Sequence, residues 1–180
     1  YGPVLYDKDF NSPDARGLTI AVKWTANVAN AGIKAFYLLN RAKNYDDYVT
    51  ATKNWTCPGQ NFVFASKTGD IAIRQQGSFV AKWKHQGDFI MPGTDSIYQW
   101  QGMIPMDENP AMKNPARGFV SSANQKPTDS TYPYYLGSAH HFPLYRGIII
   151  NKRLSGMNNI TPDDMMKMQT SNYNVFAEMA

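Results

Sequence analysis

Residues 91–127 limit how this chain can fold more than any other stretch, and they read MPGTDSIYQWQGMIPMDENPAMKNPARGFVSSANQKP. Four prolines fall in the first 25 residues of the stretch, and each removes a backbone donor and restricts the residue before it. A long helix and a central strand are therefore excluded there. The stretch also carries several large apolar side chains, too many to leave in water. We expect a long ordered loop that lies over a core, and such loops are commonly functional. The prolines are Pro92, Pro105, Pro110 and Pro115.

The loop runs into a short apolar segment, residues 118–123 (GFVSSA), which we predict to be a strand. The segment ends at Asn124, and Pro127 follows three residues later. Taken alone, an Asn shortly before a Pro is most often a turn residue. A side-chain amide fixed at the end of a buried strand can also point an N–H group at a substrate, so Asn124 is a candidate site residue.

The composition excludes several classes of protein. The 180 residues suffice for one domain with a sizeable core. The net charge is +4, but the basic residues are scattered, whereas a nucleic-acid-binding protein usually concentrates them on one stripe. Cys57 is the only cysteine, which excludes an internal disulfide and a cysteine-based metal cage. No stretch approaches the length of about 18 apolar residues that spans a membrane. We therefore expect no nucleic-acid partner and no membrane span.

Three short motifs follow one another in and after the proline-rich loop. PGT occupies residues 92–94, W-x-G-x-x-P occupies residues 100–105, and GFV at residues 118–120 is followed by Asn124 and Pro127. Together they resemble the penicillin acylase family, whose members are N-terminal-nucleophile hydrolases. The resemblance implies an α+β fold, part of an αββα sandwich with a mostly antiparallel sheet and covering helices. It covers nearly the whole chain and is most specific in the loop and in two flanking segments, residues 61–75 and 145–169.

Four helices are predicted from composition and periodicity. Residues 33–39 are rich in helix-favouring side chains. Residues 44–55 combine a capping Asn, acidic residues in the first turn and an apolar face with helical spacing. Residues 142–154 have a Pro near their start and basic residues near their end, although their three consecutive isoleucines mildly favour a strand. Residues 161–172 begin with a capping Thr and a Pro.

Strands are predicted in two places before the loop. Residues 18–24 (LTIAVKW) alternate partly and are rich in branched side chains. Residues 61–65 and 70–75 are two β-rich runs separated by Ser-Lys-Thr-Gly, which predicts a hairpin. Residues 128–141, by contrast, are rich in Tyr, Ser and Thr and are expected to be irregular.

The resemblance assigns roles to four residues. Asn124 matches the catalytic Asn of the family, which implies an oxyanion-hole donor, and losing one such donor typically costs about 10²–10³ in rate. Arg146, on its own a helix-surface arginine, matches an Arg that helps to position catalytic groups, a task suited to its planar fork. Phe36 and Gln60 match positions near the wall of the substrate pocket. Core packing is the alternative for Phe36, and Gln60 would place a polar group where the family usually has an apolar one.

Histidine and carboxylate positions give no support for a metal site. His140 and His141 are adjacent, but His85 is the only other histidine and no paired carboxylates lie near them in the sequence. Family members often bind calcium close to the segment that matches residues 132–141, yet this stretch contains no Asp or Glu. We therefore predict no metal, and no motif indicates a cofactor.

The mechanism implied by the resemblance uses an N-terminal Ser whose own α-amine acts as the base. The chain starts at Tyr1, so we expect the nucleophile, the N-terminal part of the β chain and the separate α chain to be missing. Residues 1–180 would then be a single domain or domain fragment that is inactive alone. The implied substrate is a small N-acyl amide: a penicillin-type β-lactam, an N-acyl-homoserine lactone or another N-acyl compound. The implied location is the periplasm. A catalytically degenerate ligand-binding protein with the same fold is the alternative.

Overall fold

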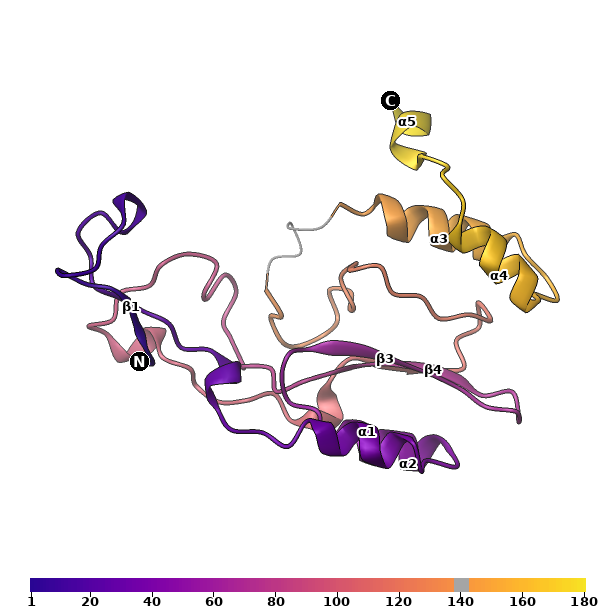
Figure 1. Ribbon diagram of the computed structural model, residues 1–180, viewed down its shortest axis with the longest axis horizontal. Coiled ribbons are helices and arrows are strands. Elements are labelled where there is room, and N and C mark those ends of the chain that lie inside the picture. The colour runs from indigo at the N-terminus through magenta and orange to yellow at the C-terminus, as the bar shows by residue number, and fades with distance from the viewer. Residues whose placement is uncertain (138–142) are drawn as a thin grey trace.

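The structure, a computed structural model, describes residues 1–137 and 143–180 (Figure 1). Its strands are β1 (Val4–Tyr6), β2 (Ile20–Ala21), β3 (Gln60–Ala65), β4 (Ile71–Gln76) and β5 (Ala111–Lys113). Its α-helices are α1 (Ile33–Leu39), α2 (Tyr45–Thr52), α3 (Tyr145–Ser155), α4 (Pro162–Gln169) and α5 (Val175–Met179). Short 3₁₀ helices lie at Pro13–Ala15, Thr25–Asn27, Ser96–Tyr98 and Met106–Glu108.

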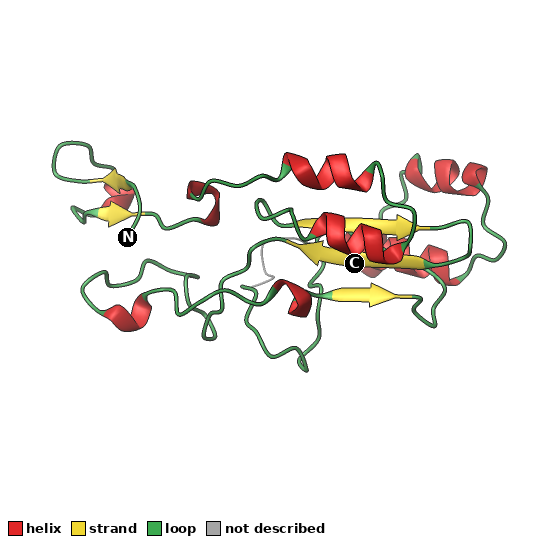
Figure 2. Cartoon of the chain, turned by 90° about the horizontal axis from the view of Figure 1, so that it is seen from below, coloured by secondary structure: helices red, strands yellow, loops and turns green. Residues whose placement is uncertain are grey.

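A three-stranded antiparallel sheet in the order β3-β4-β5 is the central layer of the molecule. Helices α1 and α2 lie on one side of this sheet, and α3 and α4 lie on the other (Figure 1). The two-stranded sheet of β1 and β2 lies apart from it, at the N-terminal end (Figures 1 and 2). Helices combined with antiparallel sheets make the α+β arrangement that the sequence predicts. Among the described residues, no helix has the length and apolar character needed to cross a membrane.

The hairpin of β3 and β4 confirms the prediction for residues 61–75. The strands pair from Gln60 opposite Gln76 to Ala65 opposite Ile71. The turn between them closes with a bond from the Ser66 amide to the Asp70 carbonyl at 2.9 Å. Alternate residues of β4 are buried, as expected for a pleated strand with one covered face.

Helix α2 packs on β3 through its aromatic face. Its cap is the one predicted, because the Asn44 side chain accepts a hydrogen bond from the Asp47 amide at 2.8 Å. Tyr48 is only 3% exposed, and its ring centroid lies 5.1 Å from that of Phe64. The Tyr48 hydroxyl donates to the Phe62 carbonyl at 2.8 Å, which ties the helix to the strand. Burying an aromatic side chain of this size is worth about 1.5–3 kcal/mol.

The buried hydroxyl of Tyr48 makes stability sensitive to alkaline pH. Burial, with a smaller contribution from Tyr45, raises the pKa of Tyr48 from 10.0 to about 12. Between these values the folded state holds a proton that the unfolded state has lost, so stability falls as pH rises from about 10 to 12. We expect a loss on the order of 2 kcal/mol. Urea denaturation at pH 9 and pH 11.5 should show a steeper loss for the wild type than for Tyr48→Phe, and equal losses would contradict this assignment.

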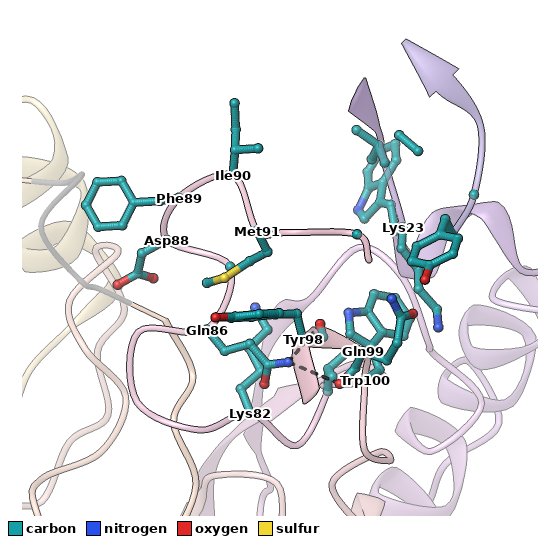
Figure 3. Close-up of a pocket in the computed structure, with 18 of the residues that line it drawn as sticks. Lys23, Lys82, Gln86, Asp88, Phe89, Ile90, Met91, Tyr98, Gln99 and Trp100 are labelled. Carbon is teal, nitrogen blue, oxygen red and sulfur yellow. Dashed lines mark hydrogen bonds between the residues drawn. The ribbon is translucent and has the colours of Figure 1, made fainter. Parts of the chain in front are cut away.

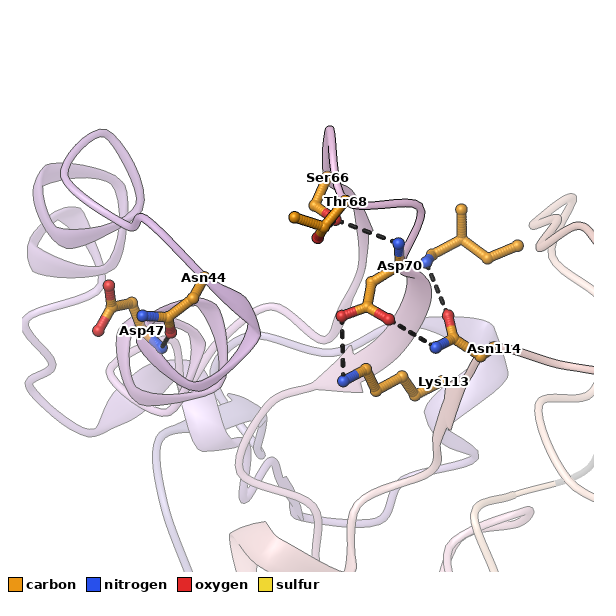
Figure 4. A network of polar contacts seen from close by, with 8 residues as sticks. Asn44, Asp47, Ser66, Thr68, Asp70, Lys113 and Asn114 are labelled. Carbon is orange, nitrogen blue, oxygen red and sulfur yellow. Dashed lines mark hydrogen bonds and ion pairs between the residues drawn. The ribbon is translucent and has the colours of Figure 1, made fainter.

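An asparagine just after the end of strand β5 adds hydrogen bonds to the backbone pairing of β5 with β4 (Figure 4). The backbone N–H of Asn114 donates to the Ile71 carbonyl at 2.8 Å, and the side-chain oxygen of Asn114 accepts from the backbone N–H of Ile71 at 2.9 Å. The Asn114 Nδ2 also donates to Asp70, which lies 3.2 Å from the Lys113 ammonium. The bond from Asn114 and the contact with Lys113 lower the pKa of Asp70. The side chain of Asn114 thus extends the ladder beyond the strand.

The proline-rich loop, residues 91–127, contains no long helix and no central strand, as predicted. Its one strand, β5, is a three-residue edge strand that follows Pro110. The loop covers the core in part, because Ile104 is 2% exposed and its amide donates to the Phe79 carbonyl at 2.8 Å. Ile97, however, is 60% exposed, so the loop does not bury all its apolar side chains.

The predicted strand at residues 118–123 is wrong, and the prediction for residues 18–24 is largely wrong. In the first segment, the Gln125 side chain accepts from the Ala123 amide and donates to the Ser121 carbonyl, and so takes hydrogen bonds that a neighbouring strand would supply. In the second, only Ile20–Ala21 form a strand, because their partner β1 is short and the pairing register shifts within it.

The helix predictions are confirmed, with shorter bounds in three cases. Helix α1 has the predicted limits, and α4 begins with the predicted Thr161 cap, which forms a capping box with Asp164. Helix α3 begins at Tyr145, and residue 142 lies outside the described residues. Helix α5 was not predicted because five residues are too few to show periodicity. Residues 128–137, the described part of the stretch expected to be irregular, contain no helix or strand.

Candidate functional site

The two predicted catalytic residues are in direct contact. Arg146, in the first turn of α3, donates from Nη2 to the Asn124 Oδ1 at 2.5 Å, across 22 residues of sequence. Asn124 is exposed and has a φ of 62°. Asn is one of the few non-glycine residues that adopt this left-handed conformation readily. Backbone and side chain together therefore hold Asn124 in one pose on the surface.

The contact with Arg146 also decides which end of the Asn124 amide faces outward. A guanidinium carries only hydrogen-bond donors, so the amide atom that faces it must be the oxygen. The Asn124 Nδ2 consequently points away from Arg146, and no hydrogen bond joins it to another described residue. The pair thus presents N–H donors, next to a positive charge, to a group that approaches from solvent.

The segment before Asn124 is attached to α3 at a second point, one helical turn further on. Asn151 accepts hydrogen bonds from the Ser121 hydroxyl and from Arg117, both at 3.2 Å. The Asn151 Nδ2 donates to the Gly147 carbonyl at 2.7 Å, which fixes the orientation of this amide as well. Helix α3 therefore serves as the platform on which residues 117–125 rest.

Phe36 and Gln60 are not bonded to this pair. Phe36 is 48% exposed, and its ring packs edge-on against Trp55 at 5.2 Å and near Phe62 at 6.5 Å. Gln60 is exposed and begins β3, on the same pleat face as Phe62. No hydrogen bond or ring contact joins Phe36 or Gln60 to Asn124 or Arg146.

The opposite face of β3 is turned toward the Asn124 segment. The Asn61 Nδ2 donates to the Ser122 hydroxyl at 2.7 Å, and Asn61 alternates with Gln60 and Phe62 along the strand. The structure therefore brings together two of the four predicted site residues, Asn124 and Arg146. The placement of Phe36 and Gln60 in a substrate pocket stays a prediction.

A cavity of about 1260 Å³ lies elsewhere, between the N-terminal strands and residues 78–100 (Figure 3). Trp24, Tyr98 and Trp100 are among its lining residues, and the Lys23 ammonium lies 4.9 Å above the Trp100 ring. None of the four predicted site residues lines it. Gln86 in its wall is 3% exposed and donates to the carbonyls of the residues at 98 and 99, so it joins the walls to each other. This cavity was not predicted from the sequence, in which the aromatic content of 13% is its only signal.

The described residues contain no group of three or more His, Cys, Asp or Glu that could hold a metal ion. His140 and His141 lie outside the described residues. The His85 Nδ1 lies 3.0 Å from an Asp88 oxygen, which also accepts from the Tyr135 hydroxyl at 2.6 Å. Asp88 is thus held by a histidine and a tyrosine.

Comparison of the whole chain with known proteins gives matches to one family. The sequence profile described as penicillin amidase matches residues 1–180. An acyl-homoserine lactone acylase, QuiP, from Pseudomonas putida is 27% identical over 144 residues, which is 78% of this chain and 18% of that protein. The penicillin acylase 2 proenzyme of Pseudomonas sp. strain SE83 is 27% identical over 114 residues, 63% of this chain and 15% of that protein. The chain thus spans less than a fifth of the length of these relatives.

A solved structure supports the fold independently. A thermostable penicillin G acylase from Alcaligenes faecalis superposes with a TM-score of 0.60 and 17% identity, covering 76% of this chain and 24% of that one. At this identity the likeness concerns the fold alone. It confirms the predicted class, an α+β piece of the N-terminal-nucleophile hydrolase type with antiparallel strands and covering helices.

Proposed function

Because this chain belongs to the penicillin amidase family, we propose that it forms part of an amidohydrolase and supplies the oxyanion-hole donor for cleavage of an N-acyl amide. The observation that supports the proposal most directly is the contact between Arg146 and Asn124, which turns the Asn124 Nδ2 outward. Donors set in advance where charge develops are usually the largest single contribution to such catalysis.

In the proposed mechanism, an N-terminal Ser from outside residues 1–180 attacks the amide carbonyl carbon. Its α-amine takes the hydroxyl proton and passes it to the departing amine. As the C=O bond becomes single, negative charge collects on the oxygen, and the Asn124 Nδ2 donates to it. Arg146 holds the Asn124 amide by its oxygen, and the guanidinium charge adds to the favourable potential. Water then attacks the acyl-enzyme, and the same donor stabilises the second tetrahedral intermediate.

The substrate class follows from what the site would recognise. Asn124 binds a carbonyl oxygen, and this group is common to a penicillin-type β-lactam and an N-acyl-homoserine lactone. Choice between the two therefore rests on the acyl and amine pockets. We assign Phe36 to the apolar wall of the acyl pocket, because its half-exposed ring offers a flat apolar surface. Gln60 would add a polar group to that wall, and this favours an acyl group with an oxygen over a plain phenyl group.

The proposal includes partners and a location. The small-molecule substrate would bind where this chain meets an α chain and the N-terminal part of the β chain, and the assembled enzyme would be periplasmic. Residues 1–180 would act as a single domain or domain fragment without the nucleophile. We expect the 180-residue chain alone to hydrolyse no acyl amide.

The intact mass of the protein expressed from its full-length gene tests this proposal. Self-cleavage into two chains, the larger one starting with Ser, Thr or Cys, together with turnover of N-acyl amides, is the expected result. A single uncut chain that binds a ligand without hydrolysing it would replace the proposal with the degenerate binding protein. Turnover by the isolated 180-residue chain would show that the nucleophile lies within it.

A further inference from the structure

We propose that Gln125 is a positioning residue for Asn124, and that its side-chain amide fixes the backbone from which Asn124 donates. This inference rests on the proposed function, since it gives Gln125 a role in the same reaction. Gln125 would touch neither the substrate nor the reacting atoms. It would act through the residues on the N-terminal side of Asn124.

The Gln125 side chain makes two hydrogen bonds with the chain just before Asn124. Its Oε1 accepts from the Ala123 amide at 2.5 Å, and its Nε2 donates to the Ser121 carbonyl at 2.9 Å. We call these two hydrogen bonds the Gln125 clamp. Ala123 is 5% exposed, so the backbone that the clamp holds is buried, whereas Asn124 is exposed. The clamp uses both ends of one planar amide, and it therefore fixes direction as well as distance.

Helix α3 lies next to the Gln125 clamp. Gly147 is buried, and a Cβ added there would lie 3.8 Å from both the Cβ and the Oε1 of Gln125. Gly147 directly follows Arg146, so two consecutive residues of one helical turn face Asn124 and its clamp. Arg146 holds the Asn124 side chain, and Gly147 lies beside the Gln125 side chain that holds the adjacent backbone.

Asn124 needs this support because packing does not provide it. The residue is exposed, and only its side-chain oxygen is tied to α3. A donor that serves an oxyanion must be held in place before the charge develops. Misplacing a catalytic group by about 1 Å can cost on the order of 100-fold in rate. Loss of the Gln125 clamp should therefore lower turnover without weakening substrate binding.

The test compares Gln125→Ala with wild type in the processed protein from the full-length gene, using an N-acyl amide that the wild type hydrolyses. Active-site titration corrects for protein that has not processed. We expect kcat to fall by about 10- to 100-fold with little change in KM. Gln101→Ala is the matched control, because the Gln101 side chain likewise donates to a nearby backbone carbonyl, that of Gln99 at 3.0 Å, and has no hydrogen bond with the Asn124 segment. Its kcat should match the wild type.

A double variant separates positioning from general damage. If Gln125 acts through Asn124, Gln125→Ala should cost nothing further in kcat once Asn124→Gly has removed the donor. If the kcat losses of the two single variants multiply in the double variant, the inference is overturned. A wild-type kcat for Gln125→Ala would overturn it as well. Full turnover by Asn124→Gly alone would overturn the proposed function instead. If Gln125→Ala fails to process, Gln125→Glu decides, because it keeps the acceptor for Ala123 and loses the donor to Ser121. An unchanged kcat in that variant would also overturn the inference.

Discussion

Replacing Asn124 with Asp should lower turnover of an N-acyl amide by at least about 10²–10³-fold and leave the fold at least as stable. The remaining oxygen still accepts from Arg146, now as a charge-assisted bond, which is stronger than the original. The second oxygen takes the place of Nδ2, so a donor to the developing oxyanion becomes a negative charge beside it. Turnover should therefore fall while stability does not. A variant that fails to fold would lose both.

Asn124→Gly completes the experiment. Glycine adopts the φ of 62° without strain and carries no amide, so it removes the donor and adds no charge. Single-turnover rates and thermal unfolding of the two variants in the processed protein provide the readouts. Asn174→Asp is the control, since Asn174 only caps α5 and Asp caps a helix equally well. A rate within threefold of wild type for both Asn124 variants would remove Asn124 from the mechanism.

Replacing Arg74 with Ala should destabilise the protein by about 3 kcal/mol or more, a large share of a typical stability. Arg74 is 4% exposed, donates to the Gln76 Oε1 at 2.8 Å, and donates to the Met106 carbonyl as well. No carboxylate of a described residue lies within ion-pair distance of it. Its loss leaves the buried Gln76 Oε1 without this donor and opens a cavity. It also removes one of two donors from the Met106 carbonyl, which accepts from the Asn109 backbone amide as well, at 3.3 Å. Relief from burying a charge offsets part of this cost.

Chemical denaturation measures the effect. Lys67→Ala, in the exposed hairpin turn, should stay within about 0.5 kcal/mol of wild type and serves as the control. The double variant Arg74→Met with Gln76→Leu should lose less than Arg74→Ala, because it removes the charge and one of its acceptors together. A loss below about 1 kcal/mol for Arg74→Ala would mean that water replaces the guanidinium at both acceptors.

Local chemistry explains which parts of the fold could be predicted. The Asn44 and Thr161 caps, and the hairpin turn before Asp70, depend on residues within a few positions of one another. The strand expected at residues 118–123 could not be judged in this way. Its outcome depends on Gln125, whose side chain replaces a strand partner, and apolar patterning does not report that event.

The candidate site divides in the same way. Asn124 and Arg146 were found because short motifs resemble those of a family, and neither residue stands out by composition. Their contact depends on how α3 is placed against the preceding segment, which periodicity cannot supply. The ring of Phe36 contacts Trp55 and Phe62 but is 48% exposed, so its place in the pocket wall stays a prediction. That Gly147 lies beside Gln125 was not visible in the sequence either, because it depends on the same placement of α3.

The positive φ at Asn124 has an evolutionary consequence. Gly, Asn and Asp occupy that backbone region at low cost, and of the three only Asn carries a side-chain N–H group. Among these three residues, Asn alone fits the positive φ and also supplies the N–H donor. A drift to Gln, which keeps the amide, would have to accept a strain of about 1–2 kcal/mol and an extra methylene. Restoring Asn is therefore the way to regain a side-chain amide donor here with the least backbone strain.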